Sequence, residues 1–362
     1  MLSTACARFW TSILLIFVSR YGSTEASPEL HSSRDVETND GLPWSAAHNH
    51  TTTTTTTTTT TITALRRVPL RRRKLLASRC STEPDAEALF IVGLSHSGTT
   101  LMLRELGKHP DVWAVPLETG AFNRAKKTGL WNKTLSETKI ARIQKGCLMT
   151  NKRLWVEKTP KHLFQLDRIF ERFPKAKVVV MIRDPRETAL SLMERSPGTS
   201  SKLRYSVSGW KTTMHALEKH PNILPVKYED LAGNCLPTMN EIIKSLGFDL
   251  DEKNGHCTAE NPFSKDENNP GVKGVKNQWK TSIPNKPEGK FGKKNHEALR
   301  AWQMQQPVKL QAPKWPDRLS TCAKYTIQTN VDAQKLIKRM GYEPDPTIIT
   351  DEQKAQCEAE QQ

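Results

Sequence analysis

The chain has 362 residues, of which 36% are hydrophobic, enough to bury the core of one large α/β domain or two small ones. Its 54 basic and 38 acidic side chains give a formal net charge of +16, which favours a polyanionic ligand, a nucleic acid or an anionic membrane surface without choosing among them. Its seven cysteines show no C-x-x-C spacing, which argues against a zinc site. Apart from Cys6 they are predicted to form disulfides, in a pairing that the sequence leaves open: Cys80, Cys147, Cys235, Cys257, Cys322 and Cys357.

The first 85 residues carry almost no material for a core. Residues 1–26 contain an apolar run that is shorter than the roughly 20 residues of a membrane span and fits a signal peptide or a short signal anchor. Residues 27–85 are predicted to be a disordered stalk and linker, with a threonine tract typical of O-glycosylation and a basic run. The basic run is interpreted as a solvated linker, with a protease-processing site or a polyanion contact as alternatives. Glycosylation sequons at Asn49 and Asn132 favour the secretory pathway.

Alternating strand and helix patterns predict one folded α/β domain over residues 86–342. The predicted strands are short apolar runs at residues 89–92, 154–156, 177–183 and 223–228. Helices are predicted after the first strand, at residues 162–173 and before Gly247. This order indicates a P-loop-like three-layer fold, in which a central parallel sheet carries helices on both faces and binds its ligand at the carboxyl ends of the strands. Residues 343–362 are predicted to be a polar tail that frays.

A glycine loop joins the first predicted strand to the helix that follows. Gly93 and Gly98 have the separation of a P-loop, G-x-x-x-x-G-K-[ST], but Thr99 occupies the position of the lysine that reaches the β- and γ-phosphates. Backbone N–H groups and the helix N-terminus can still cradle a phosphate, and Ser97 and Thr100 add hydroxyl donors. The loop therefore predicts an anionic nucleotide held without the usual triphosphate machinery, with a ligand-free turn as the alternative.

Two further polar clusters follow predicted strands. The first covers residues 157–162, where the lysines are either functional or ordinary surface charges. The second begins with Arg183, and an arginine at the carboxyl end of a strand suits bidentate phosphate binding. Ser191 follows two turns into the next helix, whose predicted N-cap is Asp184. These clusters and the glycine loop are expected to lie together at one edge of the sheet.

In their order along the chain, these motifs resemble the nucleotide-dependent sulfotransferases, whose donor is 3′-phosphoadenosine 5′-phosphosulfate (PAPS). Residues 95–100 are similar to the family's 5′-phosphosulfate loop, and Arg183 with Ser191 to its 3′-phosphate motif. Residues 226–231 resemble the segment whose tyrosine lies beside the adenine, and residues 273–280 the late loop K-G-x-x-G-D-W-K. The donor-binding residues that the resemblance implies are Ser95, His96, Ser97, Gly98, Thr99, Thr100, Arg183, Ser191, Tyr228, Lys273 and Gly274.

The chain departs from the family pattern at two positions. His96 stands where the loop usually has lysine or arginine, and Asn277 replaces the second glycine of the late loop. A neutral imidazole donates a single hydrogen bond, whereas a dianion beside it favours the protonated form. Donor affinity or rate is therefore expected to be reduced or to depend on pH.

Sulfuryl transfer needs a base for the acceptor hydroxyl, positive groups around the transferring SO3 and in-line placement. The resemblance implies that Lys158 stabilises the transferring group, with help from His96. Glu118 is predicted to be the base, because it lies in a segment that resembles the protein-tyrosine sulfotransferases, and Glu157 and His162 are the alternatives. No metal is expected, since the carboxylates lack the strand context of a Walker-B motif.

The sequence thus predicts a sulfotransferase that moves the sulfuryl group of PAPS to a hydroxyl of a glycan or of protein tyrosine. The expected location is the secretory pathway, in the Golgi lumen, with the chain anchored through its N-terminus or soluble after signal cleavage. The expected partner is a glycan or polypeptide acceptor and no nucleic acid, in an oligomeric state that the sequence leaves open. A P-loop kinase, disfavoured by Thr99, and a non-catalytic polyanion-binding protein on the same scaffold are the alternatives.

Overall fold

The computed structural model describes residues 80–81, 87–124, 129–195, 199–250, 253, 255–264, 285 and 293–360. All of them belong to one compact unit, Arg67–Gln362. The predicted signal segment, stalk and basic run, and the late loop at residues 273–280, lie outside the described residues. Among the helices of the described part, none is long and apolar enough to cross a membrane.

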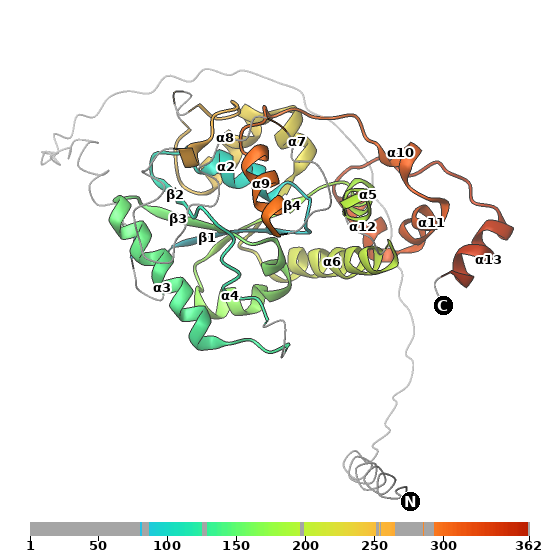
Figure 1. Ribbon diagram of the computed structural model, residues 1–362, viewed down its shortest axis with the longest axis horizontal. Helices are drawn as coiled ribbons and strands as arrows, with labels where there is room; N and C mark the ends of the chain where they lie inside the picture. The colour runs from blue at the N-terminus through green and yellow to red at the C-terminus, as the bar shows by residue number, and fades with distance from the viewer. Residues whose placement is uncertain are drawn as a thin grey trace, which may run out of the picture. The chain divides into compact units, whose positions relative to one another are not determined.

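A parallel five-stranded sheet forms the centre of the domain, which confirms the predicted α/β class (Figure 1). Its strands, in the spatial order β2-β3-β1-β4-β5, are β2 (Val112–Ala114), β3 (Leu154–Lys158), β1 (Ala88–Gly93), β4 (Lys177–Ile182) and β5 (Ile223–Lys227). The four predicted strands are all present. The three-residue β2 was not predicted, because so short a run has no measurable alternation of its own.

Helices cover both faces of the sheet, as predicted. Successive residues of β1 point to opposite faces, so Phe90 and Val92 enter one core while Leu89 and Ile91 enter the other. The first core is closed by α3 (Lys133–Thr150), α4 (Leu166–Arg172), α5 (Pro185–Arg195), α6 (Thr199–Lys219) and α12 (Val331–Arg339). The second is closed by α2 (Thr99–Leu106), α7 (Tyr228–Gly233) and α8 (Cys235–Ser245). Figure 1 shows α2, α7 and α8 on one side of the strands and α3, α4 and α6 on the other.

Local signals explain where several helices begin and end. Asn132 caps α3, since its side chain accepts a hydrogen bond from the backbone N–H of Leu135 at 2.8 Å. The segment predicted as one helix at residues 162–173 is divided into a 3₁₀ helix, η2 (Pro160–Gln165), and α4. Gly247 follows α8 with φ of +82°, a left-handed conformation that glycine adopts without strain, which confirms the predicted stop.

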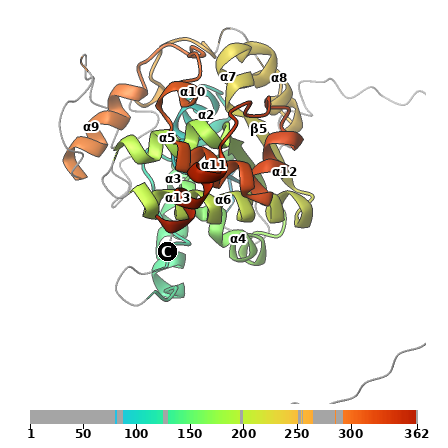
Figure 2. The ribbon, with the colours of Figure 1, turned by 90° about the vertical axis from the view of Figure 1, so that its right-hand side faces the viewer.

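The C-terminal residues are ordered, which corrects the prediction of a fraying tail. Helix α13 (Asp351–Ala359) follows α10 (Trp315–Arg318) and α11 (Thr321–Thr329), and it packs against α11 (Figure 2). The side chain of Thr350 and that of Gln353 form a capping box at its start. Cys357 is 1% exposed and bonded to Cys322. The polar composition of the tail indicated disorder, because composition does not reveal the disulfide that fixes the helix.

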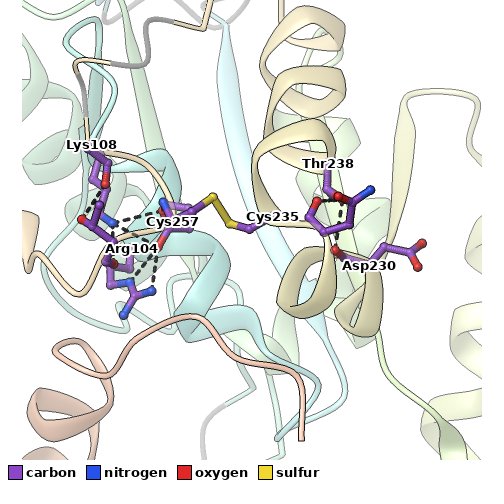
Figure 3. Close-up of a disulfide and its surroundings, with 10 residues drawn as sticks. Arg104, Lys108, Asp230, Cys235, Thr238 and Cys257 are labelled. Carbon is purple, nitrogen blue, oxygen red and sulfur yellow. Dashed lines mark hydrogen bonds and ion pairs between the residues drawn. A yellow bond between two sulfur atoms is a disulfide. The ribbon is translucent and has the colours of Figure 1, made fainter.

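Three disulfides join the six cysteines predicted to pair: Cys80–Cys147, Cys235–Cys257 and Cys322–Cys357. The second connects α8 to the segment beside α2, where Arg104 and Lys108 lie (Figure 3). Glu105 is buried in this region, pairs with both cations and accepts the backbone N–H of Cys257 at 2.7 Å. The disulfide therefore braces the helix that begins at the glycine loop.

Removing the C-terminal disulfide is expected to release α13. The two cysteines are 35 residues apart in the sequence, and a disulfide that closes a loop of this size stabilises a fold by about 2–4 kcal/mol. The double variant Cys322→Ser, Cys357→Ser should show faster hydrogen exchange in α13 and a lower melting temperature. The amides of α3 provide an internal control, and unchanged exchange in α13 would show that packing alone holds the helix.

Candidate functional site

The glycine loop connects β1 to α2 through three residues in unusual backbone conformations. Gly93, His96 and Gly98 have φ of 150°, 77° and 98°. A Cβ atom on Gly98 would lie 2.5 Å from Cδ2 of Tyr228, so glycine is required there both by φ and by the close approach of this ring. Gly98 provides no side-chain cap for α2. The first N–H groups of the helix are therefore directed at the space where an anion would bind.

A cavity of about 220 Å³ opens in front of this loop. Its walls come from the loop, the carboxyl end of β4, α5, the start of α7 and residues 300–311. Cations dominate its lining: Arg104, Arg183, Arg195, Arg300 and Lys309. No carboxylate lines it among the described residues. Such a concentration of positive charge favours a ligand that carries several negative charges.

Arg183 lies in this cavity, at the carboxyl end of β4, as predicted. Its guanidinium group is 4.8 Å from the centre of the Tyr228 ring and forms an ion pair of 3.0 Å with Glu187. Glu187 also accepts the backbone N–H of Trp315 at 2.8 Å, so its carboxylate does not depend on Arg183 alone. Asp184 accepts the backbone N–H of Arg186 at 2.9 Å, in keeping with its predicted capping role. Arg183 is thus held in place and available to an anion.

His96 links the loop to Ser191 on α5, with 2.9 Å between Nδ1 and the serine Oγ. Burial lowers the pKa of this imidazole to about 2, and the charges of Arg195, Arg300 and Arg183 add to the effect. The side chain is therefore neutral in the free protein at any ordinary pH. The loop then contributes no cation of its own, and the positive charge of the site comes from arginines on other elements.

The stability of the free protein is expected to fall at acidic pH because of His96. Its folded pKa lies well below the ordinary histidine value of 6.5, so the unfolded chain takes up a proton that the folded chain does not. The stability that depends on a neutral His96 is therefore fully present above about pH 6.5 and is lost as the pH falls below that value. In melting curves between about pH 7.5 and pH 5.5, His96→Asn should show a smaller drop than the wild type. The exposed His215→Asn is the matched control, and equal slopes for wild type and His96→Asn would contradict the prediction.

Glu118 and Lys158 lie together beside the start of α2. Lys158, fully buried at the end of β3, forms an ion pair with Glu118, whose side chain is 31% exposed. The lysine Nζ is also 3.4 Å from Oγ1 of Thr100, at the start of α2. Burial lowers the pKa of Lys158, while Glu118 counteracts this by raising it. An accessible carboxylate, a buried cation and the glycine loop are thus adjacent.

Glu157 and His162, the alternative bases, form a buried network instead. Both side chains are fully buried and lie 3.0 Å apart, from Oε2 to Nδ1. The carboxylate also accepts the hydroxyl of Thr119 at 2.7 Å, and the imidazole Nε2 accepts the backbone N–H of Phe122 at 3.1 Å. Although burial raises the pKa of Glu157, His162 and the hydroxyl donors outweigh it and lower the pKa. These two residues therefore position the loop that carries Glu118, and their geometry does not favour a role as base.

The structure brings most of the predicted residues together. His96, Gly98, Thr99, Thr100, Arg183, Ser191 and Tyr228 line the cavity. The side chains of Ser95 and Ser97 do not: the first contacts Tyr205 at 3.2 Å between hydroxyl oxygens, and the second is buried. Lys273 and Gly274 lie outside the described residues and remain predictions.

Three arginines of the cavity were missed from the sequence: Arg104, Arg195 and Arg300. Arg195 had a detectable signal, because it follows Ser191 by four residues and so shares its helix face. Arg104 looked like an ordinary helix residue, and it contacts the backbone carbonyl of Gln306. Arg300 belongs to α9 (Lys293–Gln303), 200 residues beyond its hydrogen-bond partner Thr100, and no local pattern relates the two.

Fold and site together define an α/β protein whose glycine loop faces an arginine-lined cavity, an arrangement that suits an anionic ligand. Comparison with known proteins agrees with this class. Residues 88–252 match the Sulfotransferase family. Over these residues the chain is similar to the sulfotransferases, a family of transferases that typically use PAPS, and the resemblance read from the motifs is confirmed.

Two relatives illustrate the similarity. The nodulation protein NoeE of Sinorhizobium fredii is 27% identical over 210 residues, which cover 44% of this chain and 50% of NoeE. Heparan sulfate glucosamine 3-O-sulfotransferase 6 of Homo sapiens is 31% identical over 119 residues, or 31% of this chain and 32% of that protein. The matches thus span half or less of each relative.

Comparison with solved structures found sulfotransferases. The sulfotransferase domain of the Synechococcus PCC 7002 olefin synthase has a TM-score of 0.45 at 18% identity, covering 74% of this chain and 99% of that domain. Mouse sulfotransferase SULT7A1, complexed with PAP, has a TM-score of 0.31 at 17% identity, covering 47% of this chain and 61% of that one.

Proposed function

We propose that this protein transfers the sulfuryl group of PAPS to a hydroxyl group of an acceptor. The observation that carries the proposal is the cavity itself. A loop without the P-loop lysine faces a space lined by arginines, and Lys158, paired with Glu118, lies beside Thr100 of that lining. In this proposal Arg183 and Ser191 bind the 3′-phosphate, Tyr228 lies beside the adenine, and the N-terminus of α2 binds the 5′-phosphosulfate.

The proposed reaction proceeds by in-line displacement. The acceptor oxygen attacks sulfur, the bond from sulfur to the 5′-phosphate oxygen breaks, and 3′-phosphoadenosine 5′-phosphate (PAP) leaves with that electron pair. Glu118 accepts the proton of the acceptor hydroxyl. Lys158 and the first N–H groups of α2 stabilise the negative charge that grows on the bridging oxygen. The ion pair with Lys158 holds the Glu118 carboxylate beside the start of α2.

We further propose that the acceptor is a glycan or a protein tyrosine and that the reaction takes place in the secretory lumen. The glycan option is supported by a relative that is named for sulfation of heparan sulfate glucosamine. The tyrosine option is supported by the segment around Glu118, which resembles the protein-tyrosine branch. The lumen is supported by the three disulfides, because such bonds persist in oxidising compartments and are rare in the cytosol.

Two experiments test the proposal. Calorimetry of the purified chain should show binding of PAP in the presence of EDTA, in preference to ATP with magnesium. A screen with labelled PAPS should then transfer label to one class among glycans, tyrosine peptides and small alcohols. Preference for ATP would support a kinase, and binding of PAP without transfer to any acceptor would support a non-catalytic protein.

A further inference from the structure

The site has an unusual distribution of charge around the glycine loop. The neutral His96 occupies the loop position from which a cation could reach a 5′-phosphosulfate. Thr99 likewise replaces the lysine of a P-loop. A donor with several negative charges nevertheless needs positive groups at this end, so another element has to provide them.

Arg300 reaches the loop from α9, a helix that lies outside the segment matched to the family. One of its terminal nitrogens donates to Oγ1 of Thr100 at 2.8 Å, at the start of α2. The other is 4.0 Å from the nearer carboxylate oxygen of Glu118. The guanidinium group is therefore located between the phosphate-binding end of α2 and the proposed base.

Two further observations point to an anion at this position. The side chain of Arg300 is only 10% exposed, yet its Nε has no hydrogen-bond partner in the described part of the structure. Arg195 lies close enough for mutual repulsion: burial lowers the pKa of Arg195 to about 10, and the charge of Arg300 adds to the effect. A buried guanidinium group and a partly buried one that repel each other are stabilised when an anion binds between or beside them.

We infer that Arg300 binds the 5′-phosphosulfate of the donor and supplies the positive charge that the glycine loop lacks in this chain. The inference rests on the proposed function and assigns a donor-binding residue to it. The planar guanidinium group offers several N–H donors in fixed directions, which suits the oxygens of a phosphosulfate. Its contact with Thr100 places these donors where the α2 N-terminus also points.

The test separates the two ends of the nucleotide. PAP carries both a 3′- and a 5′-phosphate, whereas 3′-AMP lacks the 5′-phosphate. The dissociation constant of 3′-AMP divided by that of PAP therefore measures the contribution of the 5′-phosphate. In the wild-type chain PAP should bind more tightly than 3′-AMP. In Arg300→Gln this ratio should fall by about 10- to 150-fold, the range for a hydrogen bond to a charged group, while the affinity for 3′-AMP stays the same.

Control variants exclude a purely structural role. Arg183→Ala should weaken both nucleotides equally, since it acts on the 3′-phosphate. Adding His96→Arg to Arg300→Gln should restore part of the lost ratio, because it places a cation back on the loop. If Arg300→Gln does not fold, Arg300→Lys, which keeps the charge and loses the fork, should show a smaller loss of the same ratio.

An unchanged ratio in the folded Arg300 variant, or equal weakening of both nucleotides, would overturn this inference and leave the proposed function intact. A wild-type chain that binds neither nucleotide would overturn the proposed function and this inference with it.

Discussion

Replacing Glu118 with glutamine is expected to reduce sulfuryl transfer by about 10²- to 10⁴-fold, the usual contribution of a general base. Glutamine keeps the size of the side chain and an oxygen that can accept a hydrogen bond from Lys158. It cannot accept the proton of the acceptor. The dissociation constant of PAP should therefore stay close to the wild-type value, and the loss should appear in kcat measured with labelled PAPS.

The buried Lys158 makes a control necessary, because removing a charged partner can destabilise a fold. Melting curves of Glu118→Gln should show a folded chain. Glu137→Gln, on the surface ion pair with Arg172, is the matched variant and should retain full activity. If Glu118→Gln is folded and active, Glu118 is not the base. Glu157→Gln would then have to be tested, although the buried network around Glu157 argues against it.

Replacing Arg183 with alanine is expected to weaken PAP binding by about 10- to 150-fold, since a hydrogen bond to a charged group contributes about 1.5–3 kcal/mol. The variant should fold, because Glu187 keeps its bond to the backbone of Trp315 and the core beneath β4 is untouched. Calorimetry with PAP measures the effect. The binding should also become less sensitive to salt, because one cation has been removed from the site.

The exposed Arg142 on α3 provides the matched control, because Arg142→Ala removes the same charge from the chain without touching the cavity. Equal affinities for wild type and Arg183→Ala would show that the 3′-phosphate binds elsewhere. Equal losses in the two arginine variants would indicate that only the net charge matters.

Much of the scaffold could be predicted because it depends on local sequence. The strands are apolar runs, the helices have apolar periodicity, and glycines mark the turns. Parallel strands align their carboxyl ends, so residues that directly follow β1, β3 and β4 had to meet at one edge of the sheet. Gly98, Lys158 and Arg183 were found in this way.

Failures of prediction have a common cause in contacts between distant segments. The tail was predicted to fray because its composition is polar. Its helix is instead held by a disulfide to Cys322, which composition does not reveal. Glu157 was a plausible base until its burial against His162 became visible. In a sheet buried on both faces, only the chain path decides which polar side chain points into the core network and which into the cavity.

The glycine loop shows both sides of this division. By itself the sequence predicted a loop that binds an anion without a lysine, because the spacing of Gly93 and Gly98 and the identity of Thr99 are local facts. Only the tertiary structure decided where the compensating positive charge comes from. Arg300 reaches Thr100 across 200 residues of sequence, and such a contact depends on how α9 packs against α2 and on no pattern within either helix.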